Sequence, residues 1–316
     1  MRAVAVRGFG GTPELMDISV PRPAPGEVLV ELTAASVNPI DLGIAAGRLP
    51  LPHVTPLVLG VDGAGRVTET GEGVHGLEPG DLVHGQFFRS PLGHGTFAEY
   101  AVVTEFPDHG ALQRVPDGVP AEIAAALPTA GMTALGVLDA LGLRAGQSIL
   151  ITGATGGVGT IAVQLAAARG AEVIATARPD ADRWIRELGA AATADHTAGD
   201  TAAQVRKTHR SGIDAFLDLT GDTAGFGEYA GLVRDGGAAA SVTFTAPPEL
   251  LASERIAVSN FEMRDKPDLL ARITAEVAAG RIMVPVQRTV HLDEVPEALA
   301  RNGAGGARGK TTVRIR

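Results

Sequence analysis

The sequence predicts an α/β protein in which a doubly wound parallel sheet is inserted into a β-rich domain. Up to about residue 118 the chain consists of short strands separated by turn residues. From Pro120 onward, apolar strands alternate with helices, which is typical of a parallel sheet covered on both faces. The segment after Lys266 is too short for a core of its own, so we expect it to pack on the N-terminal part.

The β-rich part is predicted from alternating apolar residues bounded by Gly or Pro. Its expected strands are Met1–Arg7, Glu27–Ala34, Ala64–Thr70, Asp81–Gln86 and Thr96–Val103.

The α/β part begins with two helical segments and continues as alternating strands and helices. The expected helices are Ala121–Leu127, Thr133–Leu141, Thr160–Arg169, Ala181–Leu188, Thr201–His209 and Gly225–Leu232. The expected strands are Gln147–Thr152, Glu172–Ala177, Ala191–Asp195, Ile213–Leu219, Ala238–Phe244 and Ile256–Phe261.

The C-terminal segment repeats the alternation of strands and helices on a smaller scale. It is expected to contain helix Pro267–Ala279, strand Val284–Val290, helix Leu292–Arg301 and strand Thr311–Ile315. The glycines of Gly303–Gly309 precede a strand and not a helix, which favours a turn over a phosphate-binding loop. Arg308 and Lys310 are nevertheless able to reach a cofactor phosphate.

Composition excludes several classes of function. The 316 residues include 27 basic and 36 acidic side chains, a net charge of −9, which argues against nucleic-acid and membrane partners. Cysteine is absent, so disulfides, thiolate zinc sites and a cysteine nucleophile are excluded. Since Met1 to Gly10 lacks the pattern of a secretory signal, we expect a cytoplasmic protein.

The strongest motif is a glycine-rich turn between a predicted strand and a predicted helix. It comprises Gly153, Ala154, Thr155, Gly156, Gly157, Val158 and Gly159. Such a turn lets the backbone approach a pyrophosphate, which the N–H groups and the dipole of the helix then bind. The alternative is a close helix–strand turn that binds no ligand.

The end of the next strand favours NADP(H) over NAD. An NAD site places an acidic residue there to bind the ribose, whereas this chain has Thr176, Ala177 and Arg178, with no carboxylate before Asp180. The guanidinium of Arg178 suits a 2′-phosphate. The alternative is that Arg178 is only a solvated surface charge.

The histidines do not form a recognisable metal motif. The eight of them are scattered, with neither HxxxH nor HExxH spacing, and loop or surface positions account for them better than zinc does. No metal site is therefore predicted. The alternative considered is that Asp62, His84 and His94 approach one another through folding.

Several segments together resemble the medium-chain dehydrogenase/reductase superfamily, in its zinc-free quinone oxidoreductase (zeta-crystallin-like) branch. They run in family order along nearly the whole chain. The matching segments are Ala35–Asp41, Gly60–Arg66, Pro79–Val83, Gly95–Tyr100, Ala126–Ala134, Gly153–Gly159 and Gly309–Lys310.

The resemblance implies a Rossmann domain, residues 119–264, inserted into a GroES-like catalytic domain formed by residues 1–118 and 265–316. Zinc-dependent relatives carry Cys where this chain has Asn38, and Gly-His-Glu where it has Gly60-Val61-Asp62. The resemblance therefore implies a zinc-independent protein.

The resemblance also implies roles for individual residues. Asn38, Asp41 and Thr129 are expected on the catalytic side of the nicotinamide; Asn38 is alternatively a turn residue before Pro39, and Asp41 a structural cap. The expected cofactor-binding residues outside the glycine-rich turn are Thr176, Arg178, His196, Thr220, Val242, Thr243 and Lys310. Relatives often carry Tyr shortly after the Asn-Pro-x-Asp motif, but Leu42-Gly43-Ile44 follows here, so the resemblance leaves the choice of substrate open.

The implied function is an NADPH-dependent oxidoreductase that passes a hydride to a small-molecule quinone or activated enone. One alternative is an enoyl thioester reductase or a pathway-specific enone reductase of the same fold. Another is an NADPH-binding protein with a structural or regulatory role. An exposed edge strand near Ile256–Phe261, together with family habit, predicts a homodimer.

Overall fold

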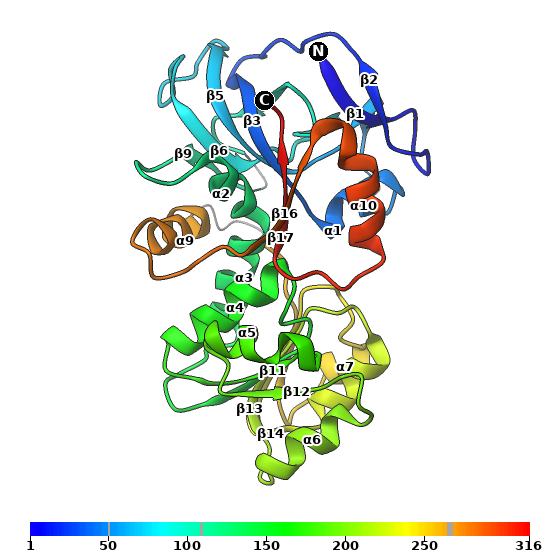
Figure 1. The fold of residues 1–316 in the computed structure, drawn as a ribbon, viewed down its shortest axis with the longest axis vertical. Coiled ribbons are helices and arrows are strands. Elements are labelled where there is room, and N and C mark those ends of the chain that lie inside the picture. The colour runs from blue at the N-terminus through cyan, green and yellow to red at the C-terminus, as the bar shows by residue number, and fades with distance from the viewer. Residues whose placement is uncertain (50, 108–109, 264–267) are drawn as a thin grey trace. The chain divides into compact units, whose positions relative to one another are not determined.

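A computed structural model describes residues 1–49, 51–107, 110–263 and 268–316 (Figure 1). The chain divides into two compact units. The first consists of Met1–Met132 and Arg264–Arg316, and the second of Thr133–Met263. An inserted domain between two parts of a discontinuous one agrees with the sequence analysis.

The first unit is mostly β-structure. Its strands are β1 (Arg2–Val6), β2 (Glu14–Asp17), β3 (Glu27–Val37), β4 (His53–Val58), β5 (Asp62–Thr70), β6 (Leu82–Gln86), β7 (Leu92–His94), β8 (Tyr100–Thr104), β9 (Leu112–Arg114), β16 (Val286–His291) and β17 (Lys310–Arg314). Its helices are α1 (Pro39–Ala45), α2 (Ala121–Ala126), α9 (Asp268–Ala278), η2 (Leu292–Glu294) and α10 (Val295–Gly303). Helix α3 (Pro128–Ala140) contains the boundary between the units.

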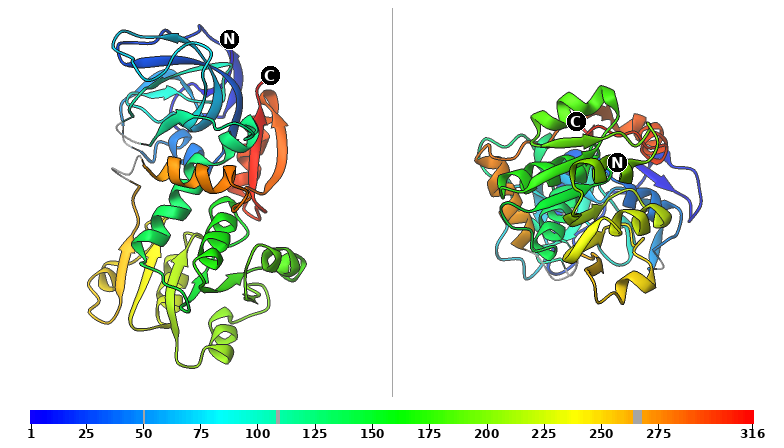
Figure 2. Two further views of the ribbon diagram at one scale, coloured as in Figure 1. Left: turned by 90° about the vertical axis from the view of Figure 1, so that its left-hand side faces the viewer. Right: turned by 90° about the horizontal axis from the view of Figure 1, so that it is seen from below.

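Two sheets form this unit within the described ranges. One has the strand order β2-β1-β4-β7, and the other β16-β17-β3-β5-β6-β9, with β8 pairing with β3. Strand β17 pairs with β3 in antiparallel fashion, so the C-terminal and N-terminal segments share one sheet (Figure 2). This pairing confirms that the C-terminal segment packs on the β-rich half.

The first junction lies later than the sequence analysis expected, at residue 132 rather than 118. Helix α2 causes this difference. Its small residues Ala124 and Ala125 are fully buried against Ala34 of β3 and Ala64 of β5, which attaches the helix to the first unit. Small side chains allow this close approach.

The second unit contains one parallel sheet with helices between its strands. Its strands are β10 (Ser148–Ile151), β11 (Glu172–Thr176), β12 (Ala192–Ala194), β13 (Ile213–Asp218), β14 (Val233–Ser241) and β15 (Ala257–Asn260). Its helices are α4 (Gly157–Ala168), η1 (Pro179–Ala181), α5 (Asp182–Glu187), α6 (Thr201–Thr208), α7 (Thr223–Ala230) and α8 (Pro248–Leu251).

The strand order of this sheet is β12-β11-β10-β13-β14-β15, and every pair is parallel. This is the doubly wound dinucleotide-binding order, in which ligands bind outside the carboxyl ends of the strands. The fold class predicted from the sequence is thus confirmed. Strand β15 lies at the edge of the sheet, as expected for Ile256–Phe261.

Some elements differ from the sequence analysis. Strands β2, β4, β7 and β9 and helices α1 and α8 were not expected, because they are short and their apolar periodicity is weak. Strand β8 begins only at Tyr100, since the preceding residues Thr96 and Phe97 instead donate backbone hydrogen bonds to Gly60 and Leu59. The expected start of helix α9, Pro267, lies outside the described residues. None of the helices in the described ranges is long and apolar enough to cross a bilayer.

Candidate functional site

The glycine-rich turn connects the buried strand β10 to helix α4, as predicted. Gly153 has a φ of 66°, which favours glycine. A Cβ atom on Gly159 would lie 2.3 Å from the Gly153 carbonyl oxygen, so the helix begins this close to the turn only because residue 159 is glycine. Gly156 caps the N-terminus of α4. The first N–H groups of a helix have no partner within the helix, so this end suits an anion.

The turn is open at the position where a pyrophosphate would approach. A Cβ atom on Gly156 would have a single neighbour within 4 Å, the Gly153 carbonyl oxygen at 3.4 Å. The residues present therefore fit a dinucleotide phosphate held at the start of α4.

Three residues expected to bind the cofactor lie at the carboxyl ends of the neighbouring strands β11 and β12. Thr176 accepts a hydrogen bond from the Gly153 N–H at 3.2 Å, so its hydroxyl fixes the start of the glycine-rich turn. Arg178 and His196 are both exposed, each just beyond the carboxyl end of its strand. The two strands are adjacent and parallel, which places Arg178 and His196 on one edge of the sheet.

Asp195 is a neighbour of both Arg178 and His196. Its carboxylate accepts hydrogen bonds from the Thr197 hydroxyl at 2.7 Å and the Thr197 N–H at 2.8 Å. These bonds, and then the charges of His196 and Arg178, hold the pKa of Asp195 below its usual value. Asp195 is therefore ionised, and its carboxylate would lie near a phosphate bound at Arg178.

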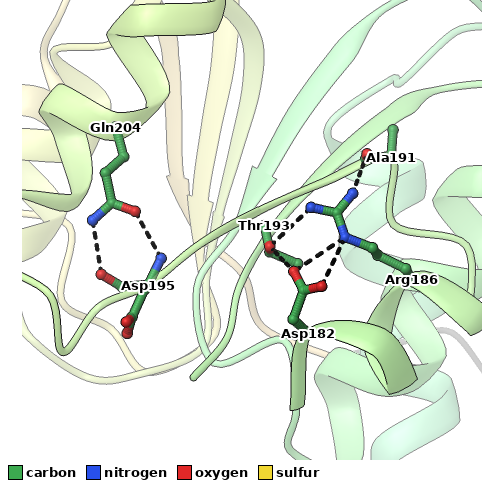
Figure 3. A network of polar contacts seen from close by, with 6 residues as sticks. All are labelled: Asp182, Arg186, Ala191, Thr193, Asp195 and Gln204. Carbon is green, nitrogen blue, oxygen red and sulfur yellow. Dashed lines mark hydrogen bonds and ion pairs between the residues drawn. The ribbon is translucent and has the colours of Figure 1, made fainter. Parts of the chain in front are cut away.

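A network of polar contacts fixes strand β12 and Asp195, which follows it directly (Figure 3). The Gln204 side chain pairs with the backbone N–H and carbonyl of Asp195, both at 2.8 Å. On the other side, Arg186 of α5 binds Asp182, the Ala191 carbonyl and the Thr193 hydroxyl. These contacts anchor β12 at both ends and so position the loop that follows it.

Asp218, the last residue of β13, organises the carboxyl edge of the sheet. It is buried and accepts hydrogen bonds from several hydroxyl groups and one N–H group. Its donors, with distances to the carboxylate, are Thr152 Oγ1 (2.9 Å), Thr220 Oγ1 (2.7 Å) and N (3.0 Å), Ser241 Oγ (3.2 Å), Thr243 Oγ1 (3.2 Å) and Thr245 Oγ1 (2.8 Å). Burial acts to raise its pKa, but the hydrogen bonds outweigh burial and lower the pKa.

The Asp218 cluster ties together the loops that follow β10, β13 and β14. Thr220 and Thr243, both expected to bind the cofactor, turn their hydroxyls toward Asp218, and the Val242 N–H donates to the Asp218 carbonyl at 3.2 Å. Sequence reasoning missed Asp218 itself. Its only local signal is an acidic residue that ends an otherwise apolar strand.

A second buried polar cluster lies in the first unit and contains Asn38. The Asn38 amide donates to Asp62 Oδ2 at 3.0 Å, and its Oδ1 accepts from Lys310 Nζ at 2.6 Å. Its backbone N–H donates to Asp41 Oδ2 at 2.8 Å, within the capping box that starts α1. The structure thus brings Asn38, Asp41 and Lys310 together as buried residues.

Lys310 differs from the expectation that it reaches a cofactor phosphate. Its ammonium group is buried and donates to Asn38 and to the Val37 carbonyl at 3.1 Å. The reason is that β17 pairs with β3, which turns the Lys310 side chain onto the end of β3.

The half-buried Thr129 connects this cluster to the buried Gln86 of β6. Its hydroxyl donates to Asp62 Oδ1 at 2.7 Å and accepts from Gln86 Nε2 at 2.7 Å, while its N–H also donates to Asp62. All partners of the Asp62 carboxylate are therefore donors, which suits its ionised form. Gln86 was not expected, and only its spatial proximity identifies it.

Burial perturbs the ionisable groups of this cluster. Desolvation raises the pKa of Asp41 to about 8 and raises that of Asp62, whereas it lowers the pKa of Lys310. Asp41 Oδ1 has no hydrogen-bond partner among the described residues, so nothing compensates its ionised form fully. The Coulombic attraction between Lys310 and Asp62 opposes the effect of burial on both pKa values, whereas a pKa of about 8 favours the protonated form of Asp41 at neutral pH.

The histidine positions do not come together as a metal site. Within the described ranges, no three His, Cys, Asp or Glu side chains are arranged to hold an ion. His84 is buried, with Nδ1 2.9 Å from the Ala124 carbonyl, and burial lowers its pKa to about 4. His94 is partly buried, and its pKa is also lowered, first by desolvation.

Comparisons with known proteins agree with this architecture. Residues 24–116 match the alcohol dehydrogenase GroES-like domain, and residues 157–265 match the zinc-binding dehydrogenase family. The mitochondrial NAD(P)H oxidoreductase RTN4IP1 of Mus musculus is 32% identical, over 92% of this chain and 82% of the relative.

Solved structures of similar proteins also agree with this architecture. The quinone oxidoreductase from Coxiella burnetii is similar with a TM-score of 0.89 and 27% identity, covering 100% of this chain and 99% of the other. A mycobacterial protein in complex with NADPH is similar with a TM-score of 0.87 and 25% identity, and covers 100% of both chains.

Proposed function

This chain belongs to the medium-chain dehydrogenase/reductase superfamily and is a nicotinamide-dependent oxidoreductase, and we propose that it transfers a hydride from NADPH to a quinone or an activated enone without a metal. The observation that carries this proposal is the open glycine-rich turn at the start of α4, with the exposed Arg178 after the next strand. Together they form a phosphate site and a 2′-phosphate partner on one sheet edge.

The preference for NADPH is supported by the charges at the end of β11. Arg178 is exposed, the first carboxylate beyond β11 is Asp180, and His196 adds a second nitrogen donor at the neighbouring strand. One similar structure holds NADPH. A 2′-phosphate would form charge-assisted hydrogen bonds here, which NADH lacks.

In the proposed reaction the protein aligns the cofactor with the acceptor and binds the cofactor phosphates. When bound, NADPH supplies a hydride with its two electrons, and a quinone then takes its proton from water. The start of helix α4 would hold the pyrophosphate, and the loops tied to Asp218 fix the carboxyl edge near Val242 and Thr243. Their rigidity lowers the entropy cost of alignment.

Lys310 supports a reaction without a metal. Relatives that use zinc bind it at the positions of Asn38 and of Gly60-Val61-Asp62. In this chain Asn38 and Asp62 bond to each other, and the Lys310 ammonium lies 2.6 Å from Asn38 Oδ1. Both polar atoms of the Asn38 side chain are therefore already hydrogen-bonded within the protein, which disfavours Asn38 as a metal ligand.

The test is NADPH oxidation with three acceptors: 1,4-benzoquinone, an alkyl enone and an enoyl thioester. Turnover with benzoquinone supports the proposal, and turnover only with the thioester supports the alternative reductase. Tight NADPH binding without turnover of any acceptor contradicts the catalytic proposal and favours a binding protein. Absence of binding by either dinucleotide contradicts the whole proposal.

We also propose that the chain forms a homodimer through β15. This strand lies at the edge of the parallel sheet, and its residues alternate between exposed and half-buried. Such an edge presents unpaired backbone groups. A monomer in light scattering would contradict this proposal.

A further inference from the structure

Phe244 combines two features that each cost free energy in a folded chain. Its backbone has a φ of 61°, and no other non-glycine residue in the described part of the chain has a positive φ. Its side chain is 60% exposed, although it is a large apolar group. A bulky residue in this backbone region indicates strain, which persists only where the surroundings enforce it.

The Asp218 cluster enforces this conformation. The residues on either side, Thr243 and Thr245, direct their hydroxyls to Asp218 at 3.2 and 2.8 Å. Their backbone N–H groups both donate to Ser241 Oγ, at 3.1 and 3.3 Å. Because both neighbours are held inward, the residue between them is turned outward.

The position of Phe244 is the carboxyl edge of the parallel sheet. It follows β14, which pairs with β13, and β13 pairs with β10 ahead of the glycine-rich turn. The loops are adjacent, since a Cβ atom on Gly221 would lie 3.7 Å from Thr243 Cβ and one on Gly153 would lie 3.1 Å from Leu219 Cβ. This edge is where ligands bind in open α/β sheets.

We propose that Phe244 is a specificity-determining residue that presents its ring to the acceptor. This inference rests on the proposed function and narrows it. A rigid aromatic face favours a flat ring, because offset stacking adds to the burial of apolar area. The acceptor class is therefore a planar cyclic one, the quinones, in preference to acyclic enones.

The test compares Phe244→Gly and Phe244→Leu with the wild type. Each is assayed for NADPH oxidation with 1,4-benzoquinone and with the acyclic pent-3-en-2-one, alongside thermal unfolding and NADPH binding. Phe106→Leu is the matched control, since Phe106 is an 82% exposed phenylalanine in the first unit.

We expect both Phe244 variants to raise the KM for benzoquinone about tenfold. The KM for the acyclic enone and the Kd for NADPH should change about twofold at most, and Phe106→Leu should change none of them. Phe244→Gly should unfold at the same temperature as the wild type or higher, because glycine adopts this backbone without strain.

An unchanged KM for benzoquinone in both variants would overturn the inference. An equal rise in the KM for both acceptors, together with a lower Tm, would also overturn it, because that result indicates that Phe244 only maintains the loop conformation. A wild type that is inactive with both acceptors contradicts the proposed function instead, and the assignment of Phe244 fails with it.

Discussion

The two units each bury a carboxylate, but the pKa of one is lowered and that of the other is raised. Asp218 in the second unit is surrounded by hydroxyl donors from three loops, and its pKa lies below the usual value. Asp41 in the first unit accepts one backbone hydrogen bond from Asn38, and its pKa is raised to about 8. The comparison shows that burial alone does not set the pKa of a carboxyl group, because hydrogen bonds from donors oppose the effect of desolvation.

The largest effect is expected from Asp218→Asn. The hydroxyls of Thr152, Thr220 and Thr245 all donate hydrogen bonds to the Asp218 carboxylate. The variant removes the negative charge and replaces one acceptor oxygen by an NH₂ group, so not all of these hydroxyls keep an acceptor. We expect a loss of about 3 kcal/mol in the free energy of unfolding. Urea denaturation measures it.

The control for Asp218→Asn is Asp222→Ala, which removes the exposed N-cap of α7 and should cost only about 1 kcal/mol. An equal, small loss in both variants would show that the Asp218 cluster does not stabilise the unit.

In the first unit, Lys310→Met should also destabilise strongly. It leaves Asn38 Oδ1 and the Val37 carbonyl without the hydrogen-bond donor that both share. Each buried acceptor left without a donor costs about 1 to 3 kcal/mol. Thermal and urea unfolding measure the loss.

The control for Lys310→Met is Arg288→Met, at an exposed position of the neighbouring strand β16, which should be nearly neutral. A Lys310→Met variant as stable as the wild type would contradict the stabilising role of the Lys310 hydrogen bonds to Asn38 and Val37.

A third variant, Arg178→Ala, should change the affinity for the cofactor and not the stability of the protein. Loss of charge-assisted hydrogen bonds to the 2′-phosphate should weaken NADPH binding by roughly ten- to a hundredfold and leave NADH binding unchanged. Energy transfer from Trp184, the single tryptophan, to the bound cofactor measures both Kd values. An equal weakening for both dinucleotides would refute a role in phosphate recognition.

The smallest effect at neutral pH is expected from Asp41→Asn, because the amide resembles the protonated carboxyl group. A raised folded-state pKa means that the wild type loses stability as the pH rises from the unfolded value of about 4 to about 8. The variant lacks this loss. It should differ from the wild type by about 1 kcal/mol or less at pH 6 and become the more stable of the two at pH 9. Urea midpoints at both pH values check this, and parallel pH profiles would contradict it.

The features that the sequence predicts are those that depend on residues close together in the chain. The glycine-rich turn, the strands around it and the position of Arg178 depend on residues close together in the chain, and the fold class was therefore predictable. The alternating period of β3 and the apolar run of β10 are likewise local signals.

The polar clusters were not predictable in this way. Lys310 and Asn38 are separated by 272 positions, and the assignment of Lys310 to a cofactor phosphate could not anticipate the pairing of β17 with β3. The threonines around Asp218 follow different strands, so only the parallel register reveals them as one cluster. Phe244 has an ordinary local sequence, and its backbone strain is a product of that cluster.

The most direct test of the account is the Kd of the wild-type protein for NADPH and for NADH, measured by energy transfer from Trp184. The account predicts that NADPH binds at least about tenfold more tightly, through Arg178 and the start of α4. Equal affinities, or tighter binding of NADH, would contradict it.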